Sequence, residues 1–407
     1  MKRFCLYTIV FFNVLLLFGC REEIIPPVNP EPQPRVEAER TVIIYMAADN
    51  SLSAAVRGDT IEMVRGKNLI PQDVNVVIFI DGGDNRSAIY ELSAKEGMKP
   101  WKRYSEPLCS TDSLVMLNIL QEIETNFPAR HFGITFWSHA SGWSPERQSS
   151  RQKTFGKDEH ADTAALEKKE MEIPVLRDVL AQLPKFDYIF FDACFMQCIE
   201  VAYELKDLAN YIVGSPAEIP GPGAPYYKVM EALCKGDAMG IVNGYDSGYP
   251  GEYYGFYYPG VLLSCIDCSK LDALAEATGQ YLIPLYMNHT EWSPTGFQFY
   301  CTDLVKYNYF YDMRTTMRRL LPDEDFAAWD DIYNQAVRYS LSNTNKWYTN
   351  IILPQYAPNH HATVADPDSY GGVSMFVPLA VYSAYGWNED FRKTSWYAAT
   401  GWAETGW

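Results

Sequence analysis

The sequence contains few basic residues for its size. Its 407 residues include 34 Lys and Arg against 51 Asp and Glu, which gives a net charge of −17. A protein that binds duplex nucleic acid needs a basic surface, so nucleic acid is not an expected partner. The acidic balance instead suits a cationic substrate. The sequence also lacks a phosphate-binding glycine loop, a dinucleotide-binding glycine motif and an internal repeat, so it gives no sign of nucleotide chemistry or of a repeat architecture.

The sequence lacks a metal-binding pattern as well. Cys265 and Cys268 have the spacing of half a zinc site, but no second such pair and no paired histidines accompany them. We therefore expect no metal and no required cofactor. Removal of Cys5 with a leader and lipidation of Cys20 would leave seven of the nine cysteines. Because seven is odd, at least one thiol has no partner within the monomer.

An apolar run at Phe4–Phe18 is shorter than the roughly 20 residues that a membrane span needs. Two basic residues precede this run, and Gly19 and Cys20 follow it. This order indicates a secretory signal at residues 1–20. The position of Cys20 resembles a bacterial lipobox, in which that cysteine is lipidated. The alternative is an ordinary signal peptide with a chance cysteine.

The segment at residues 21–39 begins with acidic residues and then becomes rich in proline. A proline-rich stretch forms an extended, semi-rigid tether. Acidic residues directly after a lipidated cysteine resemble the surface-export signal of some Gram-negative lipoproteins. We therefore predict a lipid anchor at Cys20 in the cell envelope, at the outer membrane and surface-exposed.

The first half of the chain alternates between apolar runs and helical patterns. Continuous apolar runs are typical of parallel strands that are buried on both faces. Such runs occur at Thr41–Met46, Val74–Ile80, His131–Trp137, Tyr188–Phe191 and Tyr211–Val213. Helical patterns lie between them at Ser53–Arg65, Asp112–Asn126, Ile173–Leu183 and Met196–Asp207, with Asp112 as a helix N-cap. This alternation predicts a doubly wound α/β sheet with its function at the carboxyl ends of the strands.

The second half of the chain is less informative. We expect it to complete and flank the sheet, with strands at 260–266, 297–301 and 370–377 and helices at 270–282, 309–321 and 325–341. The predicted organisation is a signal at 1–20, a tether at 21–39, a core at 40–235 and a C-terminal α/β extension at 236–407.

Two predicted strand ends carry residues suited to thiol chemistry. The strand that ends at Trp137 is followed by His139, and the strand that ends at Phe191 is followed by Cys194. Adjacent parallel strands would bring both residues to one edge of the sheet. A histidine can accept the thiol proton or stabilise the thiolate, and a cysteine at a helix start gains further thiolate stability. Cys198 lies within the next helical pattern, which favours core packing, although a redox pair of Cys194 and Cys198 is an alternative.

Three segments resemble the clostripain family of cysteine peptidases, within the caspase-like group that includes the gingipains and legumains. They are Tyr45–Asn50 (Tyr-Met-Ala-Ala-Asp-Asn), Trp137–Trp143 (Trp-Ser-His-Ala-Ser-Gly-Trp) and Asp192–Met196 (Asp-Ala-Cys-Phe-Met). The resemblance covers residues 40–227. It implies a caspase-like α/β/α sandwich with a largely parallel central sheet, and cleavage of peptides or proteins after Arg or Lys.

The resemblance also implies roles for individual residues. Cys194 and His139 correspond to the catalytic pair, and the N–H groups of Ala140 and Cys194 to the oxyanion hole. Asp192 corresponds to the carboxylate that binds the P1 side chain, although a helix-capping role is the alternative. A calcium requirement is a further implication of the family.

Two residues depart from the family pattern, and both bear on activity. Ala140 replaces a glycine after the catalytic histidine, which preserves the N–H provided that no positive φ is required. Gln197 replaces a glycine three residues after the cysteine, and we expect its longer side chain to crowd or reshape the pocket. These departures keep open a second interpretation, a catalytically weak surface lipoprotein that binds peptides or proteins.

Charged residues dominate the segment at 144–170, which reads as an exposed loop. The family resemblance implies maturation by cleavage between the catalytic His and Cys, and Arg151 and Lys153 lie where that cut would fall. The alternative is an ordinary solvated loop. Farther along, Glu218 lies in a Gly/Pro-rich loop that would border the site. It either adds negative charge to the substrate pocket or, as we slightly prefer, is an exposed loop residue.

Overall fold

The computed structural model describes residues 35–82, 87–143, 154–159, 170–253, 255–290, 293–302, 308–341, 345–350, 352 and 358–407. The chain divides into two compact units, Met1–Arg35 and Val36–Trp407, and the second contains all the described helices and strands. Cys20 and the predicted signal lie outside the described residues. No helix of the described segments is long and apolar enough to cross a membrane.

A nine-stranded sheet forms the centre of this unit, in the order β15-β12-β9-β8-β5-β1-β2-β3-β4. Five neighbouring strands are parallel, and these are the five that the apolar runs predict. They are β1 (Ala38–Ala47), β2 (Val74–Asp81), β5 (Ala129–Trp137), β8 (Phe186–Asp192) and β9 (Ala209–Gly214). Antiparallel strands extend both edges, namely β3 (Ala88–Ser93) and β4 (Gly97–Arg103) on one side and β12 (Leu262–Asp267) and β15 (Val337–Leu341) on the other.

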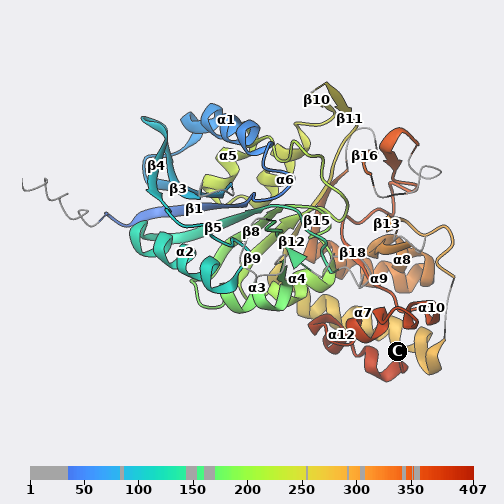
Figure 1. Cartoon of the computed structure of the whole chain (residues 1–407). Coiled ribbons are helices and arrows are strands. Elements are labelled where there is room, and N and C mark those ends of the chain that lie inside the picture. The colour runs from blue at the N-terminus through green and yellow to red at the C-terminus, as the bar shows by residue number, and fades with distance from the viewer. Residues whose placement is uncertain are drawn as a thin grey trace, which may run out of the picture. The chain divides into compact units, whose positions relative to one another are not determined.

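Helices cover both faces of the sheet, which confirms the predicted sandwich (Figure 1). One face packs against α1 (Val56–Gly66), α5 (Tyr226–Lys235) and α6 (Ala238–Asp246), and the other against α2 (Ser113–Asn126), α3 (Ile173–Leu180) and α4 (Ile199–Leu205). In β1, Val42, Ile44 and Met46 belong to one core cluster, whereas Ile43 and Tyr45 belong to the other. Because both faces are buried, the parallel strands have no alternation of apolar and polar residues.

The starts of two helices are set by different kinds of contact, a local side-chain cap for α2 and hydrogen bonds to distant residues for α4. The Asp112 side chain accepts hydrogen bonds from the N–H groups of Leu114 and Val115, which confirms it as the N-cap of α2. The predicted helix at Met196–Asp207 is wrong at its start, because α4 begins only at Ile199. Gln197 is extended instead, since its N–H donates to the Ser215 carbonyl and its carbonyl accepts from the Ser374 N–H.

The second half of the chain contributes β12 and β15 to the main sheet and builds a small sheet of its own. That sheet contains β13 (Phe299–Thr302), β14 (Asn308–Asp312) and β18 (Ser374–Met375). The helices that follow β12 in the chain are α7 (Leu271–Tyr286), α8 (Met313–Leu320), α9 (Asp323–Ala336), α10 (Ala380–Ser383), α11 (Trp387–Phe391) and α12 (Ser395–Thr400). The described residues also form three two-stranded pairs: β6 (Thr154–Phe155) with β7 (Met171–Glu172), β10 (Gly251–Tyr253) with β11 (Phe256–Tyr258), and β16 (Lys346–Tyr348) with β17 (His361–Thr363).

Three predictions in this half need correction. The helix expected at 309–321 begins as strand β14, and only Met313–Leu320 is helical. The helix expected at 325–341 ends at Ala336, because the following residues pair with β12 as strand β15. The strand expected at 370–377 is reduced to Ser374–Met375, which pairs with the end of β14.

Candidate active site

The neighbouring strands β5 and β8 deliver the two predicted catalytic residues to one cleft. The strands run parallel in a register that pairs Trp137 with Asp192, so both end at the same level. His139 and Cys194 each lie two residues beyond this pair, and both line a cleft with a volume of about 450 Å³. The structure therefore brings together the two side chains that thiol catalysis requires.

A serine hydroxyl contacts the histidine ring. The distance between Ser51 Oγ and His139 Nε2 is 2.8 Å, and both residues line the cleft. Ser51 lies between β1 and α1, directly after the Tyr45–Asn50 motif. Sequence reasoning missed it, and the only available signal was its position next to that motif.

Asn50 fixes the loop that carries Ser51. This side chain is buried, and its amide donates to the carbonyls of Ala47 at 2.9 Å and Lys157 at 2.8 Å. Its Oδ1 accepts from the N–H of Leu52 at 2.9 Å. The hydrogen bonds of Asn50 hold the backbone on both sides of Ser51, so the serine is presented to His139 from a fixed loop.

Ala140 lies in a short antiparallel contact with Phe155. The flanking residues make the hydrogen bonds of this contact: Gly156 N–H donates to the His139 carbonyl, and Ser141 N–H donates to the Thr154 carbonyl. In such a non-hydrogen-bonded pair, the N–H of the central residue points away from the partner strand. Ala140 has no positive φ, so alanine adopts this conformation without strain and keeps its N–H.

Cys194 lies in the loop between β8 and α4, and its thiol is partly exposed. The Ile219 N–H donates to Cys194 Sγ at 3.3 Å. The expectation that Cys194 occupies a helix start is wrong, because α4 begins five residues later at Ile199. The donor at the sulfur comes instead from the loop after β9.

The residue after the thiol has an unusual backbone conformation. Phe195 has a φ of 61°, which costs about 1–2 kcal/mol for a residue with a side chain. Its ring stacks on Phe310 with centroids 5.4 Å apart. A Cβ on Gly142 would lie only 2.2 Å from the Phe195 carbonyl oxygen. The histidine motif and the cysteine motif can therefore pack this closely only because Gly142 has no side chain.

Asp192 is not among the described residues that line the cleft, and it is 4% exposed. Its carboxylate accepts hydrogen bonds from the Ala224 N–H and from the hydroxyls of Tyr226 and Tyr245, each at 3.1 Å. Burial raises the pKa of Asp192 to about 6, while these three donors oppose the rise.

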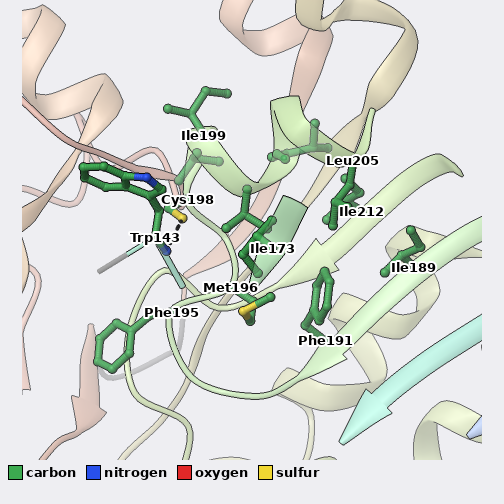
Figure 2. Packing of buried hydrophobic residues seen from close by; sticks show 14 of the residues in the cluster. Trp143, Ile173, Ile189, Phe191, Phe195, Met196, Cys198, Ile199, Leu205 and Ile212 are labelled. Carbon is green, nitrogen blue, oxygen red and sulfur yellow. Dashed lines mark hydrogen bonds between the residues drawn. The ribbon is translucent and has the colours of Figure 1, made fainter. Parts of the chain in front are cut away.

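Gln197 does not crowd the cleft, so that prediction is wrong. Its side chain is fully buried and donates to the carbonyls of Ile212 at 3.3 Å and Ser264 at 3.1 Å. It thereby links β9 to β12. Cys198 is also buried in the core, where the Trp143 N–H donates to its sulfur (Figure 2). Burial raises the pKa of the Cys198 thiol, which suits a structural role and not a redox partnership with Cys194.

A model of the clostripain family, a peptidase family, matches residues 44–407. The chain belongs to the clostripain family. Clostripain from Hathewaya histolytica is 21% identical over 223 residues, which are 48% of this chain and 42% of that protein. The chain thus spans less than half of the length of this curated relative. The match to the family model extends beyond residue 227, the last residue covered by the resemblance of the sequence motifs.

Two solved structures of cysteine peptidases have the same fold. A secreted C11 cysteine protease from Bacteroides thetaiotaomicron, in complex with an irreversible peptide inhibitor, is 29% identical with a TM-score of 0.74. The alignment covers 90% of this chain and 99% of that structure. An inactive zymogen C11 protease from Parabacteroides distasonis is 25% identical with a TM-score of 0.72, over 90% and 99% of the two chains.

Several residues that line the cleft of this clostripain-family chain could not be assigned to it from the sequence. Glu218 lines the cleft and accepts from the Thr349 hydroxyl and the Asn350 N–H, each at 2.6 Å, so it is not simply an exposed loop residue. Tyr309 and Phe310, at the start of β14, also line the cleft. The C-terminal half therefore helps to shape the site.

Some predicted features lie outside the described residues. Arg151, Lys153 and Cys20 are among them, so the structure describes neither the two predicted cleavage sites nor the anchor. Within the described segments, no three His, Cys, Asp or Glu side chains converge as metal ligands.

Proposed function

We propose that this protein is a cysteine endopeptidase that cleaves peptide bonds after Arg or Lys. The observation that carries the proposal is the shared cleft of Cys194 and His139 at the ends of β5 and β8. Membership of the clostripain family and likeness to an inhibitor-bound cysteine protease support it.

The reaction would proceed through a thioester. His139 takes the proton of the Cys194 thiol as sulfur attacks the carbonyl carbon of the scissile bond. The N–H groups of Ala140 and Cys194 stabilise the resulting oxyanion. His139 then donates its proton to the leaving amine, which leaves an acyl group on sulfur. Water, deprotonated by His139, hydrolyses this thioester and releases the carboxylic acid and the free thiol.

Asp192 would bind the basic P1 side chain, since carboxylates pair strongly with guanidinium groups. We further propose that cleavage in the 144–170 loop, after Arg151 or Lys153, activates the enzyme. The existence of an inactive zymogen among its structural relatives supports this step. We also propose that Cys20 carries the lipid anchor that holds the enzyme in the cell envelope.

The test uses the protein that lacks residues 1–20 and fluorogenic peptides with Arg, Lys or Ala at P1. We expect turnover of the Arg and Lys peptides and its loss in Cys194→Ala. Cys301→Ala is the matched control, because this second thiol also lines the cleft. A denaturing gel of the wild type and of Cys194→Ala reports self-cleavage near Lys153. No turnover after mild trypsin treatment and added calcium would favour a peptide-binding role instead.

A further inference from the structure

Strand β6 supports the segment that carries the catalytic histidine. The Thr154 carbonyl of this strand accepts from the Ser141 N–H at 3.1 Å. The Gly156 N–H, just after the strand, donates to the His139 carbonyl at 2.9 Å. These two hydrogen bonds fix the backbone on both sides of Ala140, whose N–H is proposed for the oxyanion hole.

Thr154, the first residue of β6, is buried in contact with a carboxylate. It is 2% exposed, and its hydroxyl donates to Glu170 Oε2 at 2.8 Å. Its N–H donates to Ser141 Oγ at 3.2 Å. Glu170 lies directly before β7, is half-buried, and lines the same cleft as Thr154 and Cys194. The backbone nitrogen of Thr154 thus belongs to the residue whose hydroxyl Glu170 already binds.

Cleavage after Lys153 would create a charge at this nitrogen. Hydrolysis of the Lys153–Thr154 bond adds a hydroxyl group to the Lys153 carbonyl carbon and a hydrogen atom to the Thr154 nitrogen. The new α-amino group takes up a further proton at neutral pH, since its usual pKa is about 8. A buried ammonium is costly unless a carboxylate pairs with it, and a new chain end frays unless contacts hold it. The cut chain therefore needs an anionic partner at Thr154.

Two glutamates lie close to Thr154 along the chain of β7, and the contacts favour the first. Glu172 is the register partner of Thr154, but its side chain is exposed, and an exposed ion pair contributes little to stability. Glu170 is half-buried and already accepts from the Thr154 hydroxyl. Lys157, a cation that lines the same cleft, pairs with Glu159. Glu170 is therefore the partner that the contacts indicate for a charge at Thr154.

We propose that Glu170 is a positioning residue that binds the new α-ammonium group of Thr154 after cleavage at Lys153. This inference rests on the proposed function, because it concerns the activation of the same site. The ion pair forms only in the cut chain, since the uncut chain has a neutral amide at Thr154. It holds β6 against His139 and Ser141. Cleavage thereby fixes the Ala140 N–H in position for the oxyanion.

The first test sequences the N-terminus of the processed fragment and compares kinetic constants. We expect the fragment to begin at Thr154. Glu170→Gln keeps an oxygen for the Thr154 hydroxyl but removes the charge, so it should lower kcat of the processed enzyme about tenfold with little change in KM. Glu172→Gln is the matched control and should keep both constants. A fragment that begins at Gln152 would overturn the inference, as would an unchanged kcat in Glu170→Gln or a loss of kcat in Glu172→Gln alone.

Amine labelling gives a second measurement, which does not depend on turnover. Protein cut after Lys153, by itself or by trypsin, is treated with an N-hydroxysuccinimide ester, and mass spectrometry follows the labelling of the Thr154 α-amino group. A carboxylate partner stabilises the ammonium form, so labelling should be about tenfold slower in the wild type than in Glu170→Gln. Equal rates would contradict the inference while cleavage after Arg or Lys stands. A protected amine in a protein that cleaves neither Arg nor Lys peptides would remove the proposed function and leave the ion pair.

Discussion

The Ser51 hydroxyl lies 2.8 Å from the Nε2 atom of His139. The contact joins the loop after β1 to the loop after β5, two segments that are 88 residues apart. It adds a third polar group to the Cys194 and His139 pair. Because Ser51 contacts the imidazole, we expect it to act as a positioning residue.

Ser51→Ala should reduce kcat with little change in KM, because the variant loses only the orientation of the imidazole. One hydrogen bond contributes about 1 kcal/mol net, which corresponds to about a fivefold lower rate. Ser51→Thr should restore most of the activity. Ser53→Ala, an exposed serine in the same loop, is the matched control. A rate equal to that of the wild type in Ser51→Ala would show that His139 needs no such partner.

Gly142→Ala should destabilise the fold and abolish activity. The new Cβ would meet the Phe195 carbonyl oxygen at 2.2 Å, and Gly142 also has a φ of 59°. Gly97→Ala carries the same backbone penalty, with a φ of 71° and no atom within 4 Å of the new Cβ. Urea unfolding should show an extra loss of about 1–3 kcal/mol in Gly142→Ala relative to Gly97→Ala. Equal losses would mean that the close approach to Phe195 is easily relieved.

Gln197→Gly, which restores the residue typical of the family, should weaken the protein and not activate it. The substitution removes the donors to the Ile212 and Ser264 carbonyls and leaves a cavity between β9 and β12. Each carbonyl left unsatisfied costs about 1–3 kcal/mol. Gln182→Gly, at an exposed position after α3, measures the cost of glycine alone. A more active and equally stable Gln197→Gly variant would contradict the structural role of the glutamine.

The buried Glu200 should make stability depend on pH. Its Oε1 accepts from the Phe376 N–H at 2.7 Å, and burial raises its pKa from the usual 4.5 to about 7. Between these values the native state holds a proton that the unfolded chain has lost. Glu200 therefore makes the free energy of unfolding fall as the pH rises from about 4.5 to 7.

In Glu200→Gln the free energy of unfolding should depend less on pH in this range. The stability of the variant relative to the wild type should therefore increase between pH 5 and pH 8. Urea unfolding at both pH values measures the difference. Glu231→Gln, on an exposed position of α5, should keep the slope of the wild type. An unchanged slope in Glu200→Gln would assign the pH dependence to other groups.

The parallel strands and the shared cleft of His139 and Cys194 could be predicted because their signals are local. Buried strands read as continuous apolar runs, and the residues just after them mark the functional edge. The start of α4 could not be predicted, since Gln197 is held extended by Ser215 and Ser374, which are distant in sequence. Strand β15 was missed because its residues continue a helical pattern and are turned into a strand by β12.

Ser51 escaped prediction for a related reason. A serine in a loop has no periodic pattern, and only the approach of His139 gives this side chain its importance.

The pairing of β5 with β8 has a consequence for a chain that is cut between them. His139 would remain with the N-terminal fragment and Cys194 with the C-terminal fragment. The two fragments would still be joined by the β5–β8 ladder. Under denaturing conditions the cut protein is expected to migrate as two bands. In solution the two fragments are expected to stay together, with the mass of the uncut chain. Neither fragment by itself would contain both His139 and Cys194.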